Sequence, residues 1–309
     1  MKPAQTCRGR MGLAVLALGL GAGCAAPRAQ FTDADWVSHS ATGRGCYERG
    51  DFRRGADAYG RAEQRAQALD DADALAVAAV NRAVCLLAIG QAEPALQGAN
   101  EALADARVAP GRQAELQVAA ARAEVALGRF APAQARLAAV LKSNPPPALR
   151  AQALLAQSAA ELALGNPAGA GEILEKGLSA GAWAGLPPLL RAEHAVRLGE
   201  IAAVEKRPAE AAARQDEAAA LWKQAGRLPE MARALAEGGR QAQAAGDWAG
   251  ACDRFYRAAR SLWAQGLQPD AVRVLEEGVE CAEKLDDEDV GKKLAALFVT
   301  FKDEKRLTK

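Results

Sequence analysis

The chain has 309 residues, of which 50% are hydrophobic but only 5% aromatic, and alanine supplies much of the apolar content. Leu, Arg, Glu and Gln are strong helix formers, whereas the residues that favour strands are scarce, so the composition predicts an all-helical protein and excludes a β-rich one. The 39 Lys and Arg balance 38 Asp and Glu, which leaves no broad basic surface for nucleic acid.

The first 23 residues have the features of an export signal. Lys2, Arg8 and Arg10 precede an apolar run over residues 11–20, which is too short to cross a bilayer because a spanning helix needs about 20 residues. A basic segment, a short apolar segment and small residues before a cleavage point are typical of secretory signals. We therefore predict that residues 1–23 are removed.

Cys24 follows Gly21-Ala22-Gly23 and resembles the lipidated cysteine of bacterial lipoproteins, although Leu20 stands one position earlier than the usual motif has it. The resemblance implies that the Cys24 thiol is acylated, with palmitate among its lipids, and that residues 24–35 tether the fold to the membrane. Ala25 after the cysteine implies sorting to the periplasmic side of the outer membrane. An ordinary secreted protein, or one anchored in the inner membrane, is the alternative.

Export would place the chain where disulfides form. No CxxC pair occurs among the four cysteines that follow Cys24, which are Cys46, Cys85, Cys252 and Cys281. They lie on apolar helical faces, so we expect buried free thiols. Cys46 with Cys85, and Cys252 with Cys281, lie in adjacent repeats, which leaves two bridges as the alternative.

A repeated unit organises the rest of the chain. Residues 50–62 read GDFRRGADAYGRA, and residues 246–258 read GDWAGACDRFYRA with the same residue types at the same offsets. Comparable turn residues recur between them at spacings of 37 to 41 residues, a period typical of helix-pair repeats. These predicted corners are Gly50, Gly90, Gly128, Gly165, Lys206 and Gly246, with a weaker one at Leu285.

Each unit also has the same internal pattern. A small residue stands five positions after most corners, and a larger one such as Tyr59 or Phe255 stands nine positions after several of them. This pattern predicts closely packed helix pairs, about six or seven of them over residues 36–301, followed by a charged tail at 302–309. We expect stiff loops at the proline-rich connectors, Asn144–Pro147 and Gly181–Pro188.

The two best units resemble the tetratricopeptide repeat (TPR) family. The matching residues are Gly43, Gly50, Asp51, Phe52, Tyr59 and Ala62 in the first unit, and Gly239, Gly246, Asp247, Trp248, Ala251, Phe255 and Ala258 in the sixth. The period of about 39 residues exceeds the family's 34, and the usual aromatic of the first helix is missing. The resemblance implies a right-handed superhelical solenoid of antiparallel helix pairs, whose first helices form a concave surface.

By the same resemblance, this surface is a candidate peptide groove. Its expected residues are Arg44, Tyr47, Asn81, Arg122, Arg197, Glu200, Arg240 and Gln243. Arginine among apolar side chains suits an extended peptide or a helix that carries acidic groups. The family's clamp for a terminal carboxylate is not expected, because only Asn81 matches it. A plain solvent-facing scaffold surface is the alternative.

The sequence contains no catalytic constellation. His39 and His194 have no partner at metal-ligand spacing, and we expect His194 to be solvated or to cap a helix. No phosphate-binding or serine-hydrolase motif occurs, and helix capping explains Asp70, Asp71 and Asp73. We therefore predict no enzyme activity, no cofactor and no metal.

Together these features predict a lipid-anchored periplasmic scaffold that mediates protein–protein interactions in cell-envelope assembly, with envelope proteins or peptides as partners. The alternative is a ligand-sensing solenoid that binds a small molecule or glycan within its superhelix. That alternative needs a closed, aromatic-lined pocket.

Overall fold

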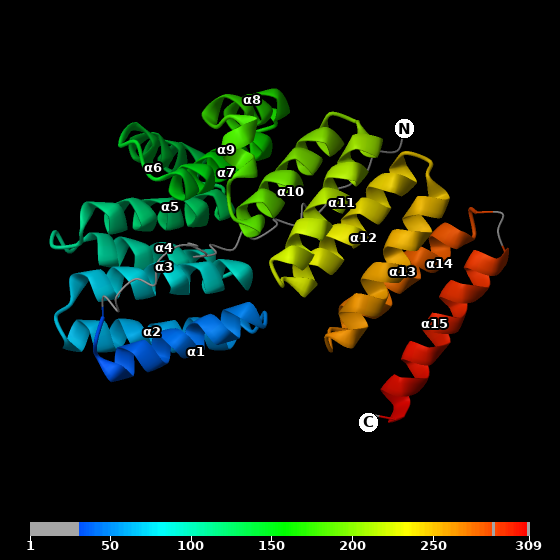
Figure 1. Cartoon of the computed structure of the whole chain (residues 1–309), viewed down its shortest axis with the longest axis horizontal. Helices are drawn as coiled ribbons and strands as arrows, with labels where there is room; N and C mark the ends of the chain where they lie inside the picture. Colours follow the sequence, from blue (N-terminus) through cyan, green and yellow to red (C-terminus); the bar gives the residue numbers. More distant parts are fainter. Residues whose placement is uncertain (1–30, 286–287, 308–309) are drawn as a thin grey trace, which may run out of the picture.

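The chain folds as a row of helices packed side by side (Figure 1). The computed structural model describes residues 31–285 and 288–307, and within these ranges it contains no β-strand. The successive pairs are α1 (Ala34–Glu48) with α2 (Phe52–Ala68), α3 (Ala72–Ala88) with α4 (Ala92–Leu103), α5 (Pro110–Ala126) with α6 (Phe130–Lys142), α7 (Pro147–Ala163) with α8 (Pro167–Gly177), α10 (Pro188–Val204) with α11 (Pro208–Gln224), α12 (Leu228–Ala244) with α13 (Trp248–Ala264), and α14 (Gln268–Ala282) with α15 (Glu288–Leu307). The predicted all-α solenoid of helix pairs is confirmed. The expected signal at 1–23 and Cys24 lie outside the described residues.

The corners within the pairs fall at the predicted positions. Gly50 has φ +77° and Gly246 has φ +80°, a left-handed conformation that lets a helix end abruptly and that glycine adopts without a Cβ clash. The same conformation recurs at Gly90, Gly128, Gly165 and Lys206. Gly226 and Gly266 adopt it as well, at corners between successive pairs. The chain therefore reverses direction at short, regular intervals.

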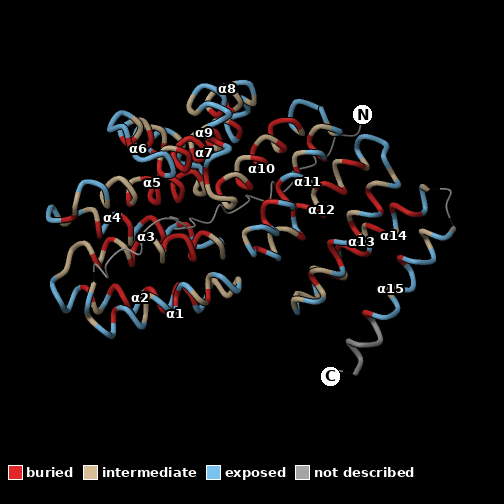
Figure 2. The backbone as a smooth tube through the Cα atoms, viewed as in Figure 1, coloured by how far each residue is buried: buried red, intermediate tan, exposed pale blue. Residues whose placement is uncertain are grey.

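The small residues five positions after each corner form the expected buried seam. They are Gly55, Ala95, Ala133, Ala170, Ala211 and Ala251, and all are buried. Figure 2 shows buried stretches along the helices. Gly43 lies so close to the Tyr59 ring that an added Cβ would sit 2.8 Å from it. Gly239 has the same relation to Phe255, again at 2.8 Å. A missing side chain in the first helix thus makes room for the aromatic ring of the second.

From the second to the fifth pair, the first helices of neighbouring pairs contact one another, since α3 packs on α5, α5 on α7 and α7 on α10. In Figure 1, α1–α5 form one block and α10–α15 another, with α6–α9 between them. The residues expected to form the groove lie on the first helices α1, α3, α5, α10 and α12.

The connector at Gly181–Pro188 differs from the expected stiff loop, because a short helix, α9 (Ala180–Ala184), runs into it. Trp183 is buried there and donates a hydrogen bond from Nε1 to the Leu174 carbonyl at 3.1 Å. Its ring stacks on His194 with 4.0 Å between the ring centroids. His194 is half-buried, so the expectation of a solvated or capping histidine was wrong. The Trp183 ring covers it instead.

Acidic residues begin several helices, as capping predicts. Asp71 accepts a hydrogen bond from the Ala74 backbone N–H at 2.9 Å. Asp70 and Asp73 instead tie α3 to the next connector, through Arg107 at 2.8 Å and the Ala109 backbone N–H at 2.9 Å. Capping therefore explains one of the three aspartates, and contact between repeats explains the other two.

The four cysteines among the described residues are buried and free, as expected. Burial raises the pKa of the Cys85 thiol to about 12, so this thiol is inert at neutral pH. The ends of the solenoid lie near the predicted ones. α1 begins at Ala34, and α15 continues to Leu307, past the expected boundary at 301.

Candidate functional site

The first and sixth helix pairs meet across the inside of the superhelix. Arg227, at the start of α12, donates a hydrogen bond from Nη1 to the Tyr47 backbone carbonyl at 2.9 Å. Its guanidinium carbon lies 4.3 Å from the centroid of the Tyr47 ring and 5.5 Å from that of Phe52. We call this the closing contact. It joins residues 180 positions apart, so the solenoid curls until its sixth pair touches its first.

Behind the closing contact lies a cavity of ≈ 420 Å³, which we call the interior cavity. It is lined by Trp36, Ser40, Arg44, Tyr47, Glu48, Tyr59, Val77, Asn81, Val84, Pro187, Pro188, Leu189, Ala225 and Arg227. These residues come from α1, α2 and α3 on one side and from the starts of α10 and α12 on the other. Arg44 and Glu48 are exposed, so the cavity opens to solvent beside them.

Several polar atoms on the cavity wall are buried without a hydrogen-bond partner among the described residues. They are Trp36 Nε1, Ser40 Oγ, Tyr47 Oη and Arg227 Nε. A buried donor or acceptor left unpaired costs about 1–3 kcal/mol, and native proteins leave few of them. Water or a ligand in the cavity would supply the missing partners. The wall therefore combines apolar side chains with polar groups whose hydrogen-bonding capacity is unused.

A group of buried and half-buried ionisable side chains adjoins the cavity. We call it the interior charge cluster, and it comprises Tyr47, Arg122, Glu193, Arg197, Arg227 and Glu230. Arg227 forms an ion pair with Glu230, and Arg197 forms one with Glu200. Tyr47 and Arg227 belong to both the cluster and the cavity wall. The two features form one continuous site.

Burial dominates the electrostatics of the cluster. Glu193 is 1% exposed, and this burial raises the pKa of its carboxyl to about 8 despite the opposing effect of Arg122 and Arg197. Burial also raises the pKa of Tyr47 and lowers that of Arg122. A carboxyl with such a pKa carries its proton in most molecules at neutral pH. Glu193 therefore gives Arg122 little counter-charge.

The structure brings most of the expected groove residues together. Arg44, Tyr47 and Asn81 line the interior cavity, while Arg122 and Arg197 lie in the adjoining cluster and Glu200 pairs with Arg197. Arg240 and Gln243 lie farther along α12 and do not line the cavity. Arg240 is instead held by Glu277 at 2.7 Å and Glu237 at 2.9 Å.

Sequence reasoning missed the residues that close the site. Glu193 stands in the fifth repeat, which matches the TPR pattern only in part, whereas Arg227 and Glu230 begin the sixth repeat outside the positions that carry the match. The Pro187–Leu189 wall follows the connector in which a stiff loop was expected. The signal available was that connector, because it interrupts the helical pattern between the fourth and fifth units. Trp36 and Tyr59 also line the cavity, although Tyr59 had been assigned to the packing between helices.

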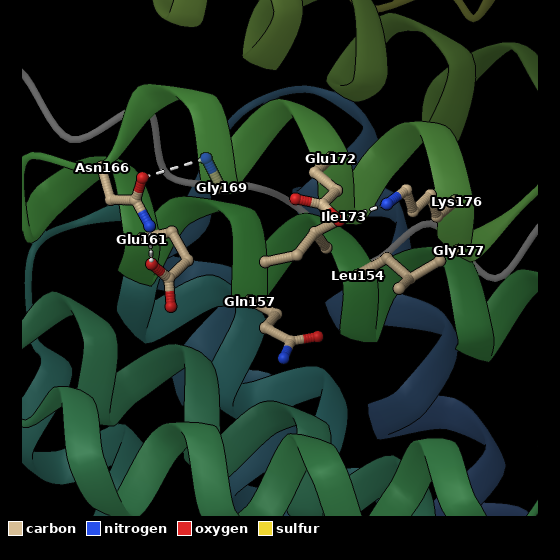
Figure 3. A pocket seen from close by; sticks show the side chains of 9 residues that line it. All are labelled: Leu154, Gln157, Glu161, Asn166, Gly169, Glu172, Ile173, Lys176 and Gly177. Atoms are coloured by element: carbon tan, nitrogen blue, oxygen red, sulfur yellow. Dashed lines mark hydrogen bonds and ion pairs between the residues drawn. The ribbon is translucent and has the colours of Figure 1, made fainter.

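A second hollow, of ≈ 490 Å³, lies between α7 and α8 (Figure 3). Most of its polar side chains are paired. Asn166 donates to Glu161 at 2.8 Å and accepts from the Gly169 backbone N–H at 3.0 Å, and Lys176 pairs with Glu172. With most of its polar groups paired in this way, this hollow is a weaker candidate than the interior cavity.

Other kinds of site receive no support from the part of the chain that the structure describes. There, no three His, Cys, Asp or Glu side chains gather in a way that would hold a metal ion. Within the same residues, no helix combines the length and the apolar character needed to cross a bilayer.

No protein-family model matches the sequence, and no curated protein matches it either. Among solved structures, a Rap protein complexed with Competence and Sporulation Factor aligns over 91% of this chain and 79% of its own, with 16% identity and a TM-score of 0.53. The Cut9–Hcn1 hetero-tetramer of the APC/C aligns over 84% of this chain and 52% of its own, with 14% identity and a TM-score of 0.48. A tetratricopeptide repeat protein from Parabacteroides merdae covers 86% of this chain and 100% of its own, with 14% identity and a TM-score of 0.42. At these identities the likeness concerns the fold alone, and that fold is a TPR-like helical repeat solenoid.

Proposed function

We propose that this chain is a lipid-anchored periplasmic scaffold that mediates protein–protein interactions in cell-envelope assembly, and that its interior cavity receives a short segment of the partner. The observation that carries the proposal is the interior cavity itself, which combines an apolar wall with unpaired buried polar atoms. The similar Rap protein was solved in complex with Competence and Sporulation Factor. That complex supports an interaction role for a solenoid of this shape.

The dimensions and chemistry of the cavity suit a peptide segment. A volume of ≈ 420 Å³ lies in the range of about 300–1,000 Å³ that ligand pockets occupy. Val77, Val84 and Leu189 offer apolar contacts, while Ser40 and Asn81 offer hydrogen bonds to a peptide backbone. The exposed Arg44 lies where the rest of a partner would continue into solvent.

The export signal and Cys24 support the membrane part of the proposal. A lipid on Cys24, followed by a tether of about a dozen residues, would hold the solenoid close to the outer membrane, where envelope proteins assemble. Secretion without a lipid, or retention at the inner membrane, would leave the cavity unchanged but would change its partners.

One observation favours a second candidate function. Trp36, Tyr47 and Tyr59 all line the interior cavity, and the closing contact covers part of it. An aromatic-lined, partly closed pocket is what a solenoid that senses a small molecule or glycan requires. Native mass spectrometry of the protein isolated from its own cells distinguishes the two, because a sensed ligand would appear as a constant added mass.

The interaction proposal is tested by filling the cavity. Wild-type protein is used to capture partners from envelope extracts beside Asn81→Trp, which places a large ring in the cavity. Gln64→Trp is the matched control, because Gln64 is an exposed amide on α2. A partner that wild type and Gln64→Trp capture and Asn81→Trp loses supports the proposal. Equal capture by all three proteins would refute it.

The anchor is tested separately. Cells that express wild type incorporate labelled palmitate into the protein, and Cys24→Ser is expected to abolish the label and release the protein from the membrane fraction. Unchanged labelling in Cys24→Ser would refute the lipid anchor on Cys24. The proposed role of the interior cavity would not be affected by that result.

A further inference from the structure

Arg122, on α5, is a buried cation without a partner. Its side chain belongs to a residue only 8% exposed, and it makes no hydrogen bond or ion pair with any described residue. Burying a charge is strongly unfavourable unless the charge is paired and hydrogen-bonded. The other two arginines of the interior charge cluster follow this rule, since Arg197 pairs with Glu200 and Arg227 with Glu230.

Glu193 is the remaining carboxyl of the cluster, and it does not pair with Arg122. Among the described residues, no arginine nitrogen lies within ion-pair distance of it, and its Oε1 is buried without a hydrogen bond. Of the three arginines in the cluster, Arg197 pairs with Glu200 and Arg227 with Glu230, and Arg122 has no carboxylate at ion-pair distance among the described residues. One positive charge, at Arg122, is left uncompensated.

Tyr47, on α1, supplies a second unpaired polar group in the interior charge cluster. Its hydroxyl is buried without a hydrogen-bond partner, it interacts electrostatically with Arg122 and Glu193, and it lines the interior cavity. A guanidinium offers two parallel N–H donors to a planar carboxylate, and a phenol O–H can add a third. The excess of one charge matches a singly charged carboxylate, whereas a doubly charged phosphate would face the nearby Glu230.

We propose that the interior site binds a carboxylate of its ligand through the Arg122 guanidinium and the Tyr47 hydroxyl. This inference rests on the proposed function and narrows it, because the partner segment then carries an acidic side chain or a free carboxyl terminus in the cavity. A small free dicarboxylic acid has the same chemistry and is the other source that a test must distinguish.

The test uses the whole folded protein and two synthetic pools of hexapeptides with blocked termini. The pools are degenerate at five positions and differ only in a fixed Glu or Gln at the remaining one. Bound peptides are measured by equilibrium dialysis and mass spectrometry, and glutarate is measured in a parallel arm. We expect wild type to retain the Glu pool at least about tenfold better than the Gln pool, as a charged hydrogen bond in a buried site would give.

Variants assign this preference to the named residues. Arg122→Met should reduce the Glu-to-Gln ratio to about one, whereas Arg61→Met, which removes an exposed arginine of α2, should leave it unchanged. Arg122→Met is expected to melt no lower than wild type, because it removes an unpaired buried charge. Tyr47→Phe keeps the ring and removes only the hydroxyl, and it should lower the Glu-to-Gln ratio several-fold. This variant tests the carboxylate site if Arg122→Met does not fold.

The outcomes separate the inference from the proposed function. Equal binding of both pools overturns the carboxylate site and leaves a peptide-binding cavity. Binding of glutarate alone, lost in Arg122→Met, supports the carboxylate site and replaces the peptide with a small acid. Binding of neither pool and no glutarate overturns both. A Glu preference that survives Arg122→Met and Tyr47→Phe overturns the assignment to these two residues.

Discussion

Arg227 lies over the Tyr47 ring, with 4.3 Å between its guanidinium carbon and the ring centroid, and donates to the Tyr47 backbone carbonyl at 2.9 Å. Arg227 is 4% exposed, so a cation–π contact and a charged hydrogen bond act here with little competition from water. The pair converts an open row of helices into a superhelix that encloses a cavity.

Removing the Arg227 side chain should open this closure. Arg227→Met loses both interactions with Tyr47 and leaves the largely buried Glu230 without its partner, and breaking a buried ion pair costs up to about 3–5 kcal/mol. Hydrogen exchange should increase at residues 44–52 and 225–230. Denaturant unfolding gives the stability change, and small-angle scattering gives the expected increase in radius.

A double variant separates opening from general instability. Arg227→Met with Glu230→Leu replaces both charges by apolar groups, so most of the lost stability should return. The exchange at residues 44–52 should stay fast, because the contact with Tyr47 is still absent. Slow exchange there in the double variant would contradict the role of Arg227 in closure.

Gly43 should not tolerate a side chain. Gly43→Ala places a methyl group 2.8 Å from the Tyr59 ring, and overpacking of this kind costs about 1–3 kcal/mol. Gly98→Ala is the matched control in α4, where an added Cβ meets nothing within 4 Å, and its higher helix propensity should stabilise the protein by up to about 1 kcal/mol. Thermal melts that rank both variants alike would refute the packing described for the first pair.

Glu193 should make the protein less stable at alkaline pH. Its carboxyl has a raised pKa of about 8 in the folded state, so between its unfolded value and pH 8 the folded chain binds one more proton than the unfolded chain. Stability then falls as pH rises, by at most about 1.4 kcal/mol per pH unit. Glu193→Gln should flatten the fall between pH 6.5 and 8, measured by chemical denaturation at each pH. An identical slope in both proteins would contradict the burial of this carboxyl.

His194 should have the opposite effect on the acid side. Burial lowers the pKa of its imidazole to about 4, so between pH 4 and 6.5 the unfolded chain binds the extra proton and stability falls as pH falls. His194→Phe keeps a ring against Trp183 and should make the protein less sensitive to acid in that window. The same series of denaturation curves tests it, and a wild-type-like acid slope in the variant would count against the stacked, neutral histidine.

The corners and the seam could be predicted from sequence because they depend on local sterics. A left-handed turn selects glycine at Gly50 and Gly246, and the fit of Tyr59 against Gly43 recurs as Phe255 against Gly239. Such relations lie within one helix pair. They recur in each repeat that has the same residues, so a comparison of repeats within one sequence can predict them.

The closing contact could not be predicted in the same way. Whether Arg227 reaches Tyr47 depends on the small rotations between successive helix pairs, added over five pairs, and on the inserted helix α9. No local sequence pattern predicts this total rotation. The expected groove therefore contained Arg44, Tyr47 and Asn81 but extended to Arg240 and Gln243, as it would in a more open superhelix. The burial of Glu193 and Arg122 likewise depends on how α10 and α5, far apart in sequence, approach one another, so the sequence did not reveal it either.

The most direct test of this account is a structure of the protein bound to the partner that it captures in the cell envelope. The account predicts partner atoms inside the interior cavity, with a carboxylate within hydrogen-bonding distance of Arg122 and the Tyr47 hydroxyl. A partner seated on the outer helices, with only water beside Arg122, would contradict it.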